Sequence, residues 1–126
     1  MLFRSFISRV SQGLPPVIFG DGSQTRDFVS AHDVVDMISM LMDDEQPEGV
    51  VFNVGTGIST RIDELARMVL DAFGSDAGIE FRDPVQGDIR DSYSDISRAR
   101  KAGYSPKVDL RSGLLEVIKA QRPGQA

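Results

Sequence analysis

Cysteine and tryptophan are absent from this sequence of 126 residues, and histidine occurs once, as His32. Without cysteine, a disulfide scaffold, a thiolate zinc site and a cysteine nucleophile are excluded. One histidine cannot build a metal site from several imidazoles, so any imidazole-based proton relay would depend on His32 alone. Its neighbour Asp33 is not expected to pair with it, because adjacent residues of a helix point in different directions. We therefore expect His32 at the surface and no metal site.

Long apolar runs are missing too, since no stretch approaches the roughly 20 apolar residues of a membrane-spanning helix. The first residues contain no apolar segment that ends in a small-residue cleavage site, as a secretory signal would. The default expectation is therefore a soluble, cytoplasmic protein.

An excess of positive charge is also lacking, with 14 Lys and Arg against 19 Asp and Glu and a formal net charge of −5. This balance argues against a general binder of nucleic acid or of anionic membranes, which needs a basic surface. A local basic site for one small anionic ligand remains compatible with it.

What the sequence does contain predicts a single domain, residues 1–126, with a modest core and an α/β or α+β fold. Apolar residues at helical spacing, with turn and capping residues at the ends, predict five helices: 2–12, 31–43, 61–73, about 96–102, and 110–118. Ser30 and Thr60 are the expected N-caps, with Asp33 and Asp63 completing capping boxes. Short strands are expected at 17–19, 26–29, 50–54 and 79–81. A turn is expected at 46–49 and a frayed tail at 122–126.

The run at residues 50–54 has the length and β-branched content of a strand buried on both faces. Gly55 and Gly57 follow it, just before a predicted helix. A dinucleotide-binding fingerprint needs a third glycine three residues later, where Thr60 stands. Backbone N–H groups at a helix start attract anions, but a turn that needs glycine for its backbone angles is the favoured interpretation.

Two polar stretches could bind an anionic ligand. In FGDGSQTRDFV, residues 19–29, two glycines allow close approach of the backbone and Arg26 offers a planar fork for phosphate oxygens. The plainer alternative is a hairpin in which Arg26 pairs with Asp27 or Asp33. In GDIRDS, residues 87–92, a carboxylate, a guanidinium and a hydroxyl stand close together, and the plainer alternative is a solvated loop.

Together these motifs form a recognisable pattern. The order PVIFGDGSQTRDFV, HDVV, VVFNVGTG, a helix and then GDIRDSYSDISRARKAGYSP resembles the carboxyl-terminal part of nucleotide-sugar epimerases and dehydratases. These enzymes are the extended short-chain dehydrogenase/reductases, with UDP-glucose 4-epimerase as the best-known relative. The resemblance runs from about residue 3 to residue 118. It implies a small substrate-binding domain that lacks most of the NAD-binding Rossmann domain.

The resemblance also implies a substrate-binding site. Arg26 matches the arginine that clamps the substrate diphosphate, and Asp88 matches the carboxylate that accepts from the ribose. Arg90 and Ser92 match a second diphosphate arginine and its neighbour. The implied substrate-binding residues are Val17, Ile18 and Phe19, from the strand beside the nucleotide base, with Arg26, Asn53, Asp88, Arg90 and Ser92. Asn53 is expected to help close the site.

One position departs from the family pattern, and one catalytic motif of the family is absent. Many relatives carry an arginine two residues before the Gly-Asp pair, where this sequence has Val85, and Arg82 is a candidate substitute. The catalytic Tyr-x-x-x-Lys is absent, because Ser97 and Val108 stand four residues after the two tyrosines. The resemblance therefore implies no catalytic residue in this chain and no turnover by the chain alone, with NAD bound by the parent enzyme.

The expected partners are a UDP- or dTDP-sugar and a Rossmann half, with a homodimer possible through exposed apolar surface. A stand-alone, non-catalytic nucleotide-binding or regulatory module derived from the family is the alternative. A structural or interaction domain without a ligand is a third reading. The presence of Arg26, Asp88, Arg90 and Ser92 argues against this third reading.

Overall fold

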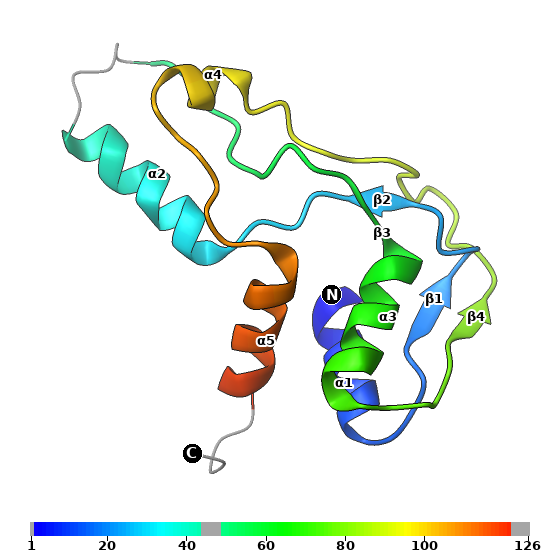
Figure 1. Ribbon diagram of the computed structural model, residues 1–126. Coiled ribbons are helices and arrows are strands. Elements are labelled where there is room, and N and C mark those ends of the chain that lie inside the picture. Colours follow the sequence, from blue (N-terminus) through cyan, green and yellow to red (C-terminus); the bar gives the residue numbers. More distant parts are fainter. Residues whose placement is uncertain (1, 44–48, 122–126) are drawn as a thin grey trace.

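The computed structural model describes residues 2–43 and 49–121 (Figure 1). Its helices are α1 (Leu2–Ser11), α2 (Ala31–Asp43), α3 (Ile62–Phe73), α4 (Ser97–Lys101) and α5 (Leu110–Ala120), and its strands are β1 (Val17–Phe19), β2 (Thr25–Arg26), β3 (Thr60–Arg61) and β4 (Glu80–Arg82). The parallel pair is β1 with β4, and the antiparallel pair is β2 with β3. The chain is thus a small mixed α/β unit, as the sequence predicts.

The first core lies between α1, α3 and α5 and includes Ile18 of β1 (Figure 1). Each helix contributes one apolar face, because its apolar residues recur at helical spacing. We call this group of buried residues the first core: Phe6, Ile7, Val10, Ile18, Ile62, Leu65, Ala66, Val69, Leu70, Leu114 and Ile118. Gly74 ends α3 in the left-handed conformation, φ 61°, as a glycine after the last turn predicts.

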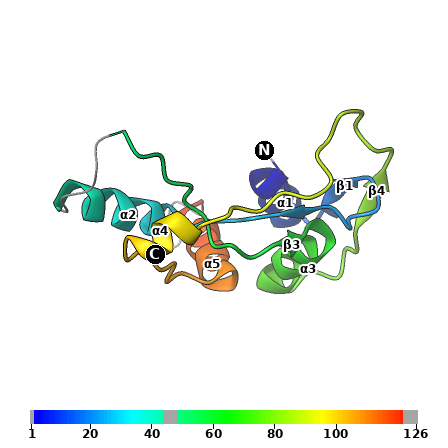
Figure 2. The same cartoon turned by 90° about the horizontal axis from the view of Figure 1, so that it is seen from above.

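The second core is smaller and lies between α2 and α4, at the opposite end of the molecule from β1 and β4 (Figure 2). We define it as four buried residues: Met37, Ile96, Ala99 and Tyr104. Phe52 and Val54 pack against them while only partly buried. Extended segments connect the two ends, so the molecule is elongated.

The strand predicted at residues 50–54 does not form. Val50 and Val51 are instead 38% and 73% exposed. A strand persists only where a neighbouring segment pairs with its backbone, and the described residues provide no such segment here. The turn expected at 46–49 falls largely outside the described residues, as does the tail at 122–126.

The predicted N-cap at Thr60 is also wrong. Thr60 lies in β3, and Arg61 precedes α3 in an extended conformation without a side-chain cap. The first amides of α3 bond to the loop before β2 instead, Ile62 N to Gln24 O at 2.9 Å and Asp63 N to Gly22 O at 3.0 Å. Backbone carbonyls therefore take the place of the side-chain cap.

The predicted cap at Ser30 is confirmed, since its Oγ accepts from His32 N at 3.1 Å. Asp33 does not complete a capping box. It is 1% exposed and accepts from the amides of Lys107 and Val108, at 2.9 and 3.2 Å. Of the strand predicted at 26–29, only Arg26 lies in a strand, namely β2. The strand β4 begins one residue later than expected. His32 is exposed, as predicted. None of the described helices is long and apolar enough to span a membrane.

Candidate nucleotide-binding site

The two polar stretches singled out in the sequence leave the same sheet edge. Because β1 and β4 are parallel, their carboxyl ends lie together, and Gly20 N continues the pairing by donating to Arg82 O at 2.9 Å. Further along, Thr25 N donates to Arg90 O at 2.8 Å, and Ser92 N donates to Thr25 O at 3.1 Å. The loop after β4 is therefore attached at both ends to the segment that follows β1.

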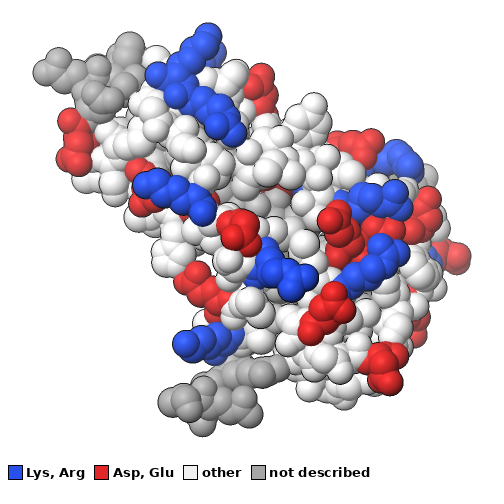
Figure 3. Space-filling view, in the orientation of Figure 1, with Lys and Arg blue, Asp and Glu red and all other residues white. Residues whose placement is uncertain are grey.

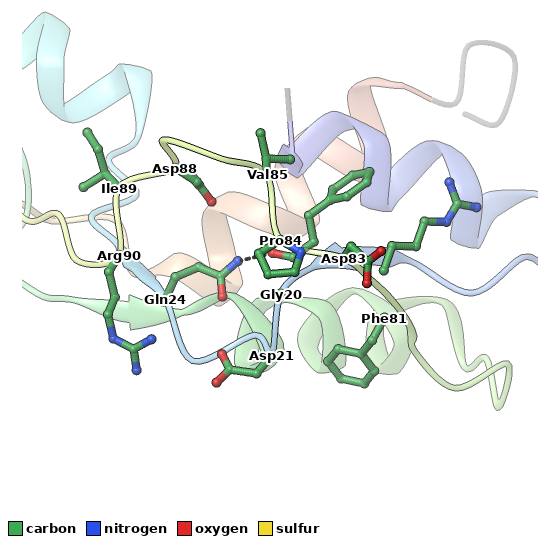
Figure 4. Close-up of a pocket in the computed structure, with 12 residues that line it drawn as sticks. Gly20, Asp21, Gln24, Phe81, Asp83, Pro84, Val85, Asp88, Ile89 and Arg90 are labelled. Carbon is green, nitrogen blue, oxygen red and sulfur yellow. Dashed lines mark hydrogen bonds between the residues drawn. The ribbon is translucent and has the colours of Figure 1, made fainter.

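Between these attachment points lies a cavity of about 710 Å³ (Figure 4). Its walls include Phe19, Gln24, Phe81, Asp88 and Arg90, with Gly20, Asp21 and residues 82–85 and 89. Figure 4 shows Asp88 and Arg90 on the loop that faces Gln24 and Asp21. This volume lies within the usual range for small-molecule sites.

Arg26 lines an adjoining cavity of about 420 Å³ that shares Phe19, Gln24 and Asp88 with the first. Its Nη2 donates to Asp88 Oδ1 at 2.9 Å, and its Nη1 donates to the carbonyl of Thr25 at 2.6 Å. The hairpin alternative, in which Arg26 pairs with Asp27 or Asp33, is therefore wrong. Both of those carboxylates accept from backbone amides elsewhere.

Arg90 is the second guanidinium of the site. Its Nη2 donates to Ser23 Oγ at 3.0 Å, and Ser23 in turn donates to Asp21 through both its amide and its hydroxyl. These bonds from Ser23, with a smaller contribution from the charge of Arg90, lower the pKa of Asp21 below its usual value. The site therefore holds two guanidinium groups, both connected to the segment that follows β1.

Of the other predicted site residues, Phe19 alone lines the cavity. Val17 and Ile18 are buried, 6% and 0% exposed, and do not line the cavity, whereas Phe19 is 41% exposed beside it. Ser92 meets the site only through its backbone bond to Thr25. Asn53 is not brought to the site, because it lines a separate cleft of about 170 Å³ with Val51 and α4.

Gln24 was missed by the sequence reasoning. Its Nε2 donates to Phe19 O at 2.9 Å, which closes the turn at residues 20–23. Its side chain lines both cavities. In the sequence, only its position directly before Thr25 and Arg26 indicated a role for Gln24. Phe81 and Pro84, which also line the large cavity, gave no signal, because only the parallel pairing of β1 with β4 brings them there.

The glycine-rich turn at Gly55 and Gly57 does bind an anion, and that anion is the chain's own Asp27. The carboxylate of Asp27 accepts from the amides of Thr56 and Gly57 and from the hydroxyl of Thr56. It also accepts from Ser94 N at 3.2 Å. Partial burial alone raises the pKa of Asp27, but the bonds from Thr56, Gly57 and Ser94 outweigh it and lower the pKa.

Glycine is required at the two positions of this turn for different reasons. Gly57 has φ 73°, which confirms the interpretation as a turn that needs glycine for its backbone angles. Gly55 is needed for space, because a Cβ there would lie 2.6 Å from Ser94 Oγ and 2.7 Å from Asp27 Oδ2. The turn therefore joins three segments of the chain around one carboxylate.

On the face drawn in Figure 3, the described basic and acidic side chains are interspersed and form no extended basic surface. Among the described residues, no cluster of His, Asp or Glu is arranged to hold a metal ion. The concave site at the ends of β1 and β4, with Arg26 and Arg90, is thus the candidate for an anionic organic ligand.

Comparison with known proteins agrees with the motif pattern. A model of the NAD dependent epimerase/dehydratase family matches residues 1–55. UDP-glucose 4-epimerase from Mycolicibacterium smegmatis is 38% identical over 115 residues, which cover 90% of this chain and 36% of that protein. The crystal structure of UDP-glucose 4-epimerase with UDP-glucose from Thermotoga maritima superposes with a TM-score of 0.89 at 33% identity, covering 97% of this chain and 39% of that one. The chain is a relative of the nucleotide-sugar epimerases and dehydratases.

The relationship extends beyond epimerases. UDP-glucuronic acid decarboxylase 2 from Arabidopsis thaliana is 34% identical over 116 residues, 91% of this chain and 26% of that protein. This chain thus spans about a quarter to two fifths of the length of these relatives. The family resemblance indicated by the motifs is confirmed.

Proposed function

We propose that this chain is the carboxyl-terminal, nucleotide-sugar-binding part of an NAD-dependent epimerase or dehydratase, and that it binds the nucleoside diphosphate of a UDP- or dTDP-sugar. The observation that carries the proposal is the convergence of Arg26, Asp88 and Arg90 at two adjoining cavities beside the ends of β1 and β4. The similarity to UDP-sugar enzymes over 90% or more of the chain supports it.

The chemistry of these side chains suits such a ligand. A guanidinium presents a planar fork of donors that matches phosphate oxygens. Asp88 can accept from sugar hydroxyls, and the half-exposed ring of Phe19 beside the cavity offers an apolar surface for a base. Binding of this kind places the sugar of the ligand for a reaction carried out by other residues.

The described residues do not fit NAD. The third glycine of the dinucleotide fingerprint is missing, and the amides of Thr56 and Gly57 are directed at Asp27. The catalytic Tyr-x-x-x-Lys is also absent from the sequence. We therefore propose that the purified chain neither binds NAD tightly nor turns over a nucleotide sugar. Reproducible conversion of UDP-glucose by the chain alone would overturn this assignment.

The test of the binding role is calorimetric titration of the purified chain with UDP. Arg26→Ala and Arg90→Ala should each weaken binding by about 1.5–3 kcal/mol, the size of a hydrogen bond to a charged group. The matched control is Arg111→Ala, which removes an exposed arginine from α5, away from the cavity. Unchanged UDP affinity in both site variants would refute the proposal.

The alternative is a stand-alone, non-catalytic nucleotide-binding or interaction module derived from this family. In its favour, the first core and the cavity are assembled from this chain's own segments. The coding sequence upstream of Met1 separates the two cases. An in-frame Rossmann half with a Tyr-x-x-x-Lys motif identifies a two-domain enzyme, and its absence favours the module.

A further inference from the structure

Arg26 and Asp27 are neighbours in the chain, but their side chains have different partners. The guanidinium of Arg26 donates to Asp88 beside the cavities, at 2.9 Å. The carboxylate of Asp27 accepts from the turn at residues 55–57, with Gly57 N at 2.9 Å. Successive side chains of an extended chain point to opposite faces. Asp27 is therefore directed away from the face on which Arg26 meets the site, and it lines neither of the two cavities there.

The segment of residues 90–94, which carries the second guanidinium, is attached on both sides of Arg26. The backbone of Thr25 holds the beginning of this segment by two bonds, of 2.8 and 3.1 Å. The carboxylate of Asp27 holds its end, where Ser94 N donates to Oδ2 at 3.2 Å. Attachment at Thr25 alone would let the segment pivot. The second attachment, at Asp27, therefore fixes the direction in which the segment runs.

The carboxylate of Asp27 is itself held in place by the glycine-rich turn. Thr56 donates to it through both its amide and its hydroxyl, and Gly57 donates through its amide. The packing is tight, because a Cβ at Gly55 would lie 2.7 Å from Asp27 Oδ2. Both carboxylate oxygens accept, so an asparagine at this position would direct an NH₂ group at N–H or O–H donors on one side.

We infer that Asp27 is a positioning residue of the candidate site, which sets the spacing of Arg26 and Arg90 so that both guanidinium groups can bind one diphosphate. This role of Asp27 rests on the proposed function, which supplies the ligand. Positioning before binding raises affinity, because the ligand does not have to order the binding groups itself. Asp27 thus contributes to binding through the two arginines and without contacting the ligand.

The test is calorimetric titration of UDP into the wild-type chain and Asp27→Asn, under conditions in which circular dichroism shows both to be folded. Asp27→Asn should weaken UDP binding about threefold or more. In the Arg90→Ala background the same substitution should have little further effect, because only one guanidinium is left to position. A purely structural role of Asp27 would instead weaken binding by the same factor with and without Arg90.

The matched control is Asp33→Asn. Asp33 is also a carboxylate that accepts from two backbone amides, those of Lys107 and Val108, but it lies on α2 and lines neither cavity of the site. Asp33→Asn should lower the stability of the fold and leave the UDP affinity within about twofold of the wild type. This comparison separates a loss of position at the site from a general loss of stability.

Thr56→Val is a second, milder variant. It keeps the shape of a side chain that lines neither cavity of the site and removes the hydroxyl that donates to Asp27. It should also weaken UDP binding, and Thr56→Ser, which keeps the hydroxyl, should restore the wild-type affinity.

Three results would overturn the positioning role of Asp27. They are an unchanged UDP affinity in the folded Asp27 and Thr56 variants, an equal loss with and without Arg90, and an equal loss in Asp33→Asn. The proposed function fails by a different result, namely a UDP affinity that does not respond to Arg26→Ala and Arg90→Ala.

Discussion

The two cores of this chain are held together by different forces. The first core is almost entirely apolar and includes Phe6, Ile18, Leu65 and Val69, each 0% exposed. Three helices and a strand close around it within the chain. The second core has four buried residues, and the helix that carries Met37 has an open apolar side, where Ile38 and Met42 are 52% and 81% exposed.

Buried polar groups compensate for the small size of the second core. Asp33 holds the segment before α5 through the amides of Lys107 and Val108, and Tyr104 donates from its hydroxyl to Gly55 O at 2.8 Å. Burial raises the pKa of Tyr104, with a smaller contribution from the charge of Asp33. Apolar burial thus stabilises one end of the molecule, and a few hydrogen bonds with defined geometry stabilise the other.

The largest expected effect tests the first core. Leu65→Ala removes a side chain that is 0% exposed and should lower the free energy of unfolding by about 2–5 kcal/mol, because it leaves a cavity. Leu115→Ala, at a leucine on α5 that is 50% exposed, is the control and should cost less than about 1 kcal/mol. Urea denaturation measures both variants. Equal changes in the free energy of unfolding for the two variants would mean that the first core does not provide most of the stability.

The sequence predicted the first core better than the second. The helices α1 and α3 carry their own periodic apolar faces, and both were predicted nearly to their ends. The strand expected at residues 50–54 failed, because a strand needs a partner that local sequence does not specify. The cap at Thr60 failed for a similar reason, since the carbonyls that replace it come from a loop about 40 residues earlier.

The sequence indicates which residues form the candidate site but not how these residues contact one another. The motifs pointed to Arg26, Asp88 and Arg90, and all three lie at the cavities. The bond between Arg26 and Asp88 joins residues 62 positions apart, so no local pattern indicates it. The role of Asp27 was missed too, because its donors come from positions 29, 30 and 67 residues away.

The second prediction concerns the polar contacts of the second core. Asp33→Ala leaves two backbone amides without their acceptor and should destabilise the fold by about 2 kcal/mol. Asp36→Ala removes an exposed carboxylate from the same helix and should change stability by less than about 0.5 kcal/mol. The comparison is made by urea denaturation. If the two variants behave alike, the bonds of Asp33 do not hold this end together.

The third prediction is a pH dependence that originates at Asp27. Its pKa is lowered in the folded chain, so the ionised form is favoured by folding. Its contribution to stability is complete above the unfolded value of about 3.9 and is lost as the pH falls through the folded pKa. Asp27→Asn should therefore be less stable near neutral pH and lose less stability on acidification. Melting curves of the wild type and of Asp27→Asn, recorded between neutral and acidic pH, test this. Equal losses of stability in the two proteins on acidification would contradict the prediction.

The smallest expected effect on stability comes from exposed apolar side chains on α2, including Met42, and at Val51 on the segment that follows α2. We expect the chain to self-associate through exposed apolar side chains of this kind, because exposed apolar surface favours association. The double variant Met42→Ser/Val51→Ser changes side chains that are 81% and 73% exposed and should alter stability by less than about 0.5 kcal/mol. Sedimentation equilibrium should show weaker association than in the wild type. A wild-type chain that stays monomeric at tens of micromolar would contradict this expectation.

The central claim, that the cavity between the ends of β1 and β4 binds a nucleoside diphosphate, is tested most directly by NMR. Backbone amide shifts of the labelled chain are followed while UDP is added. The account predicts the largest shifts in residues 19–26 and 82–92, with the turn at Gly55 and Gly57 nearly unaffected, because its amides are bonded to Asp27. No shifts at saturating UDP, or shifts centred on that turn, would contradict the claim.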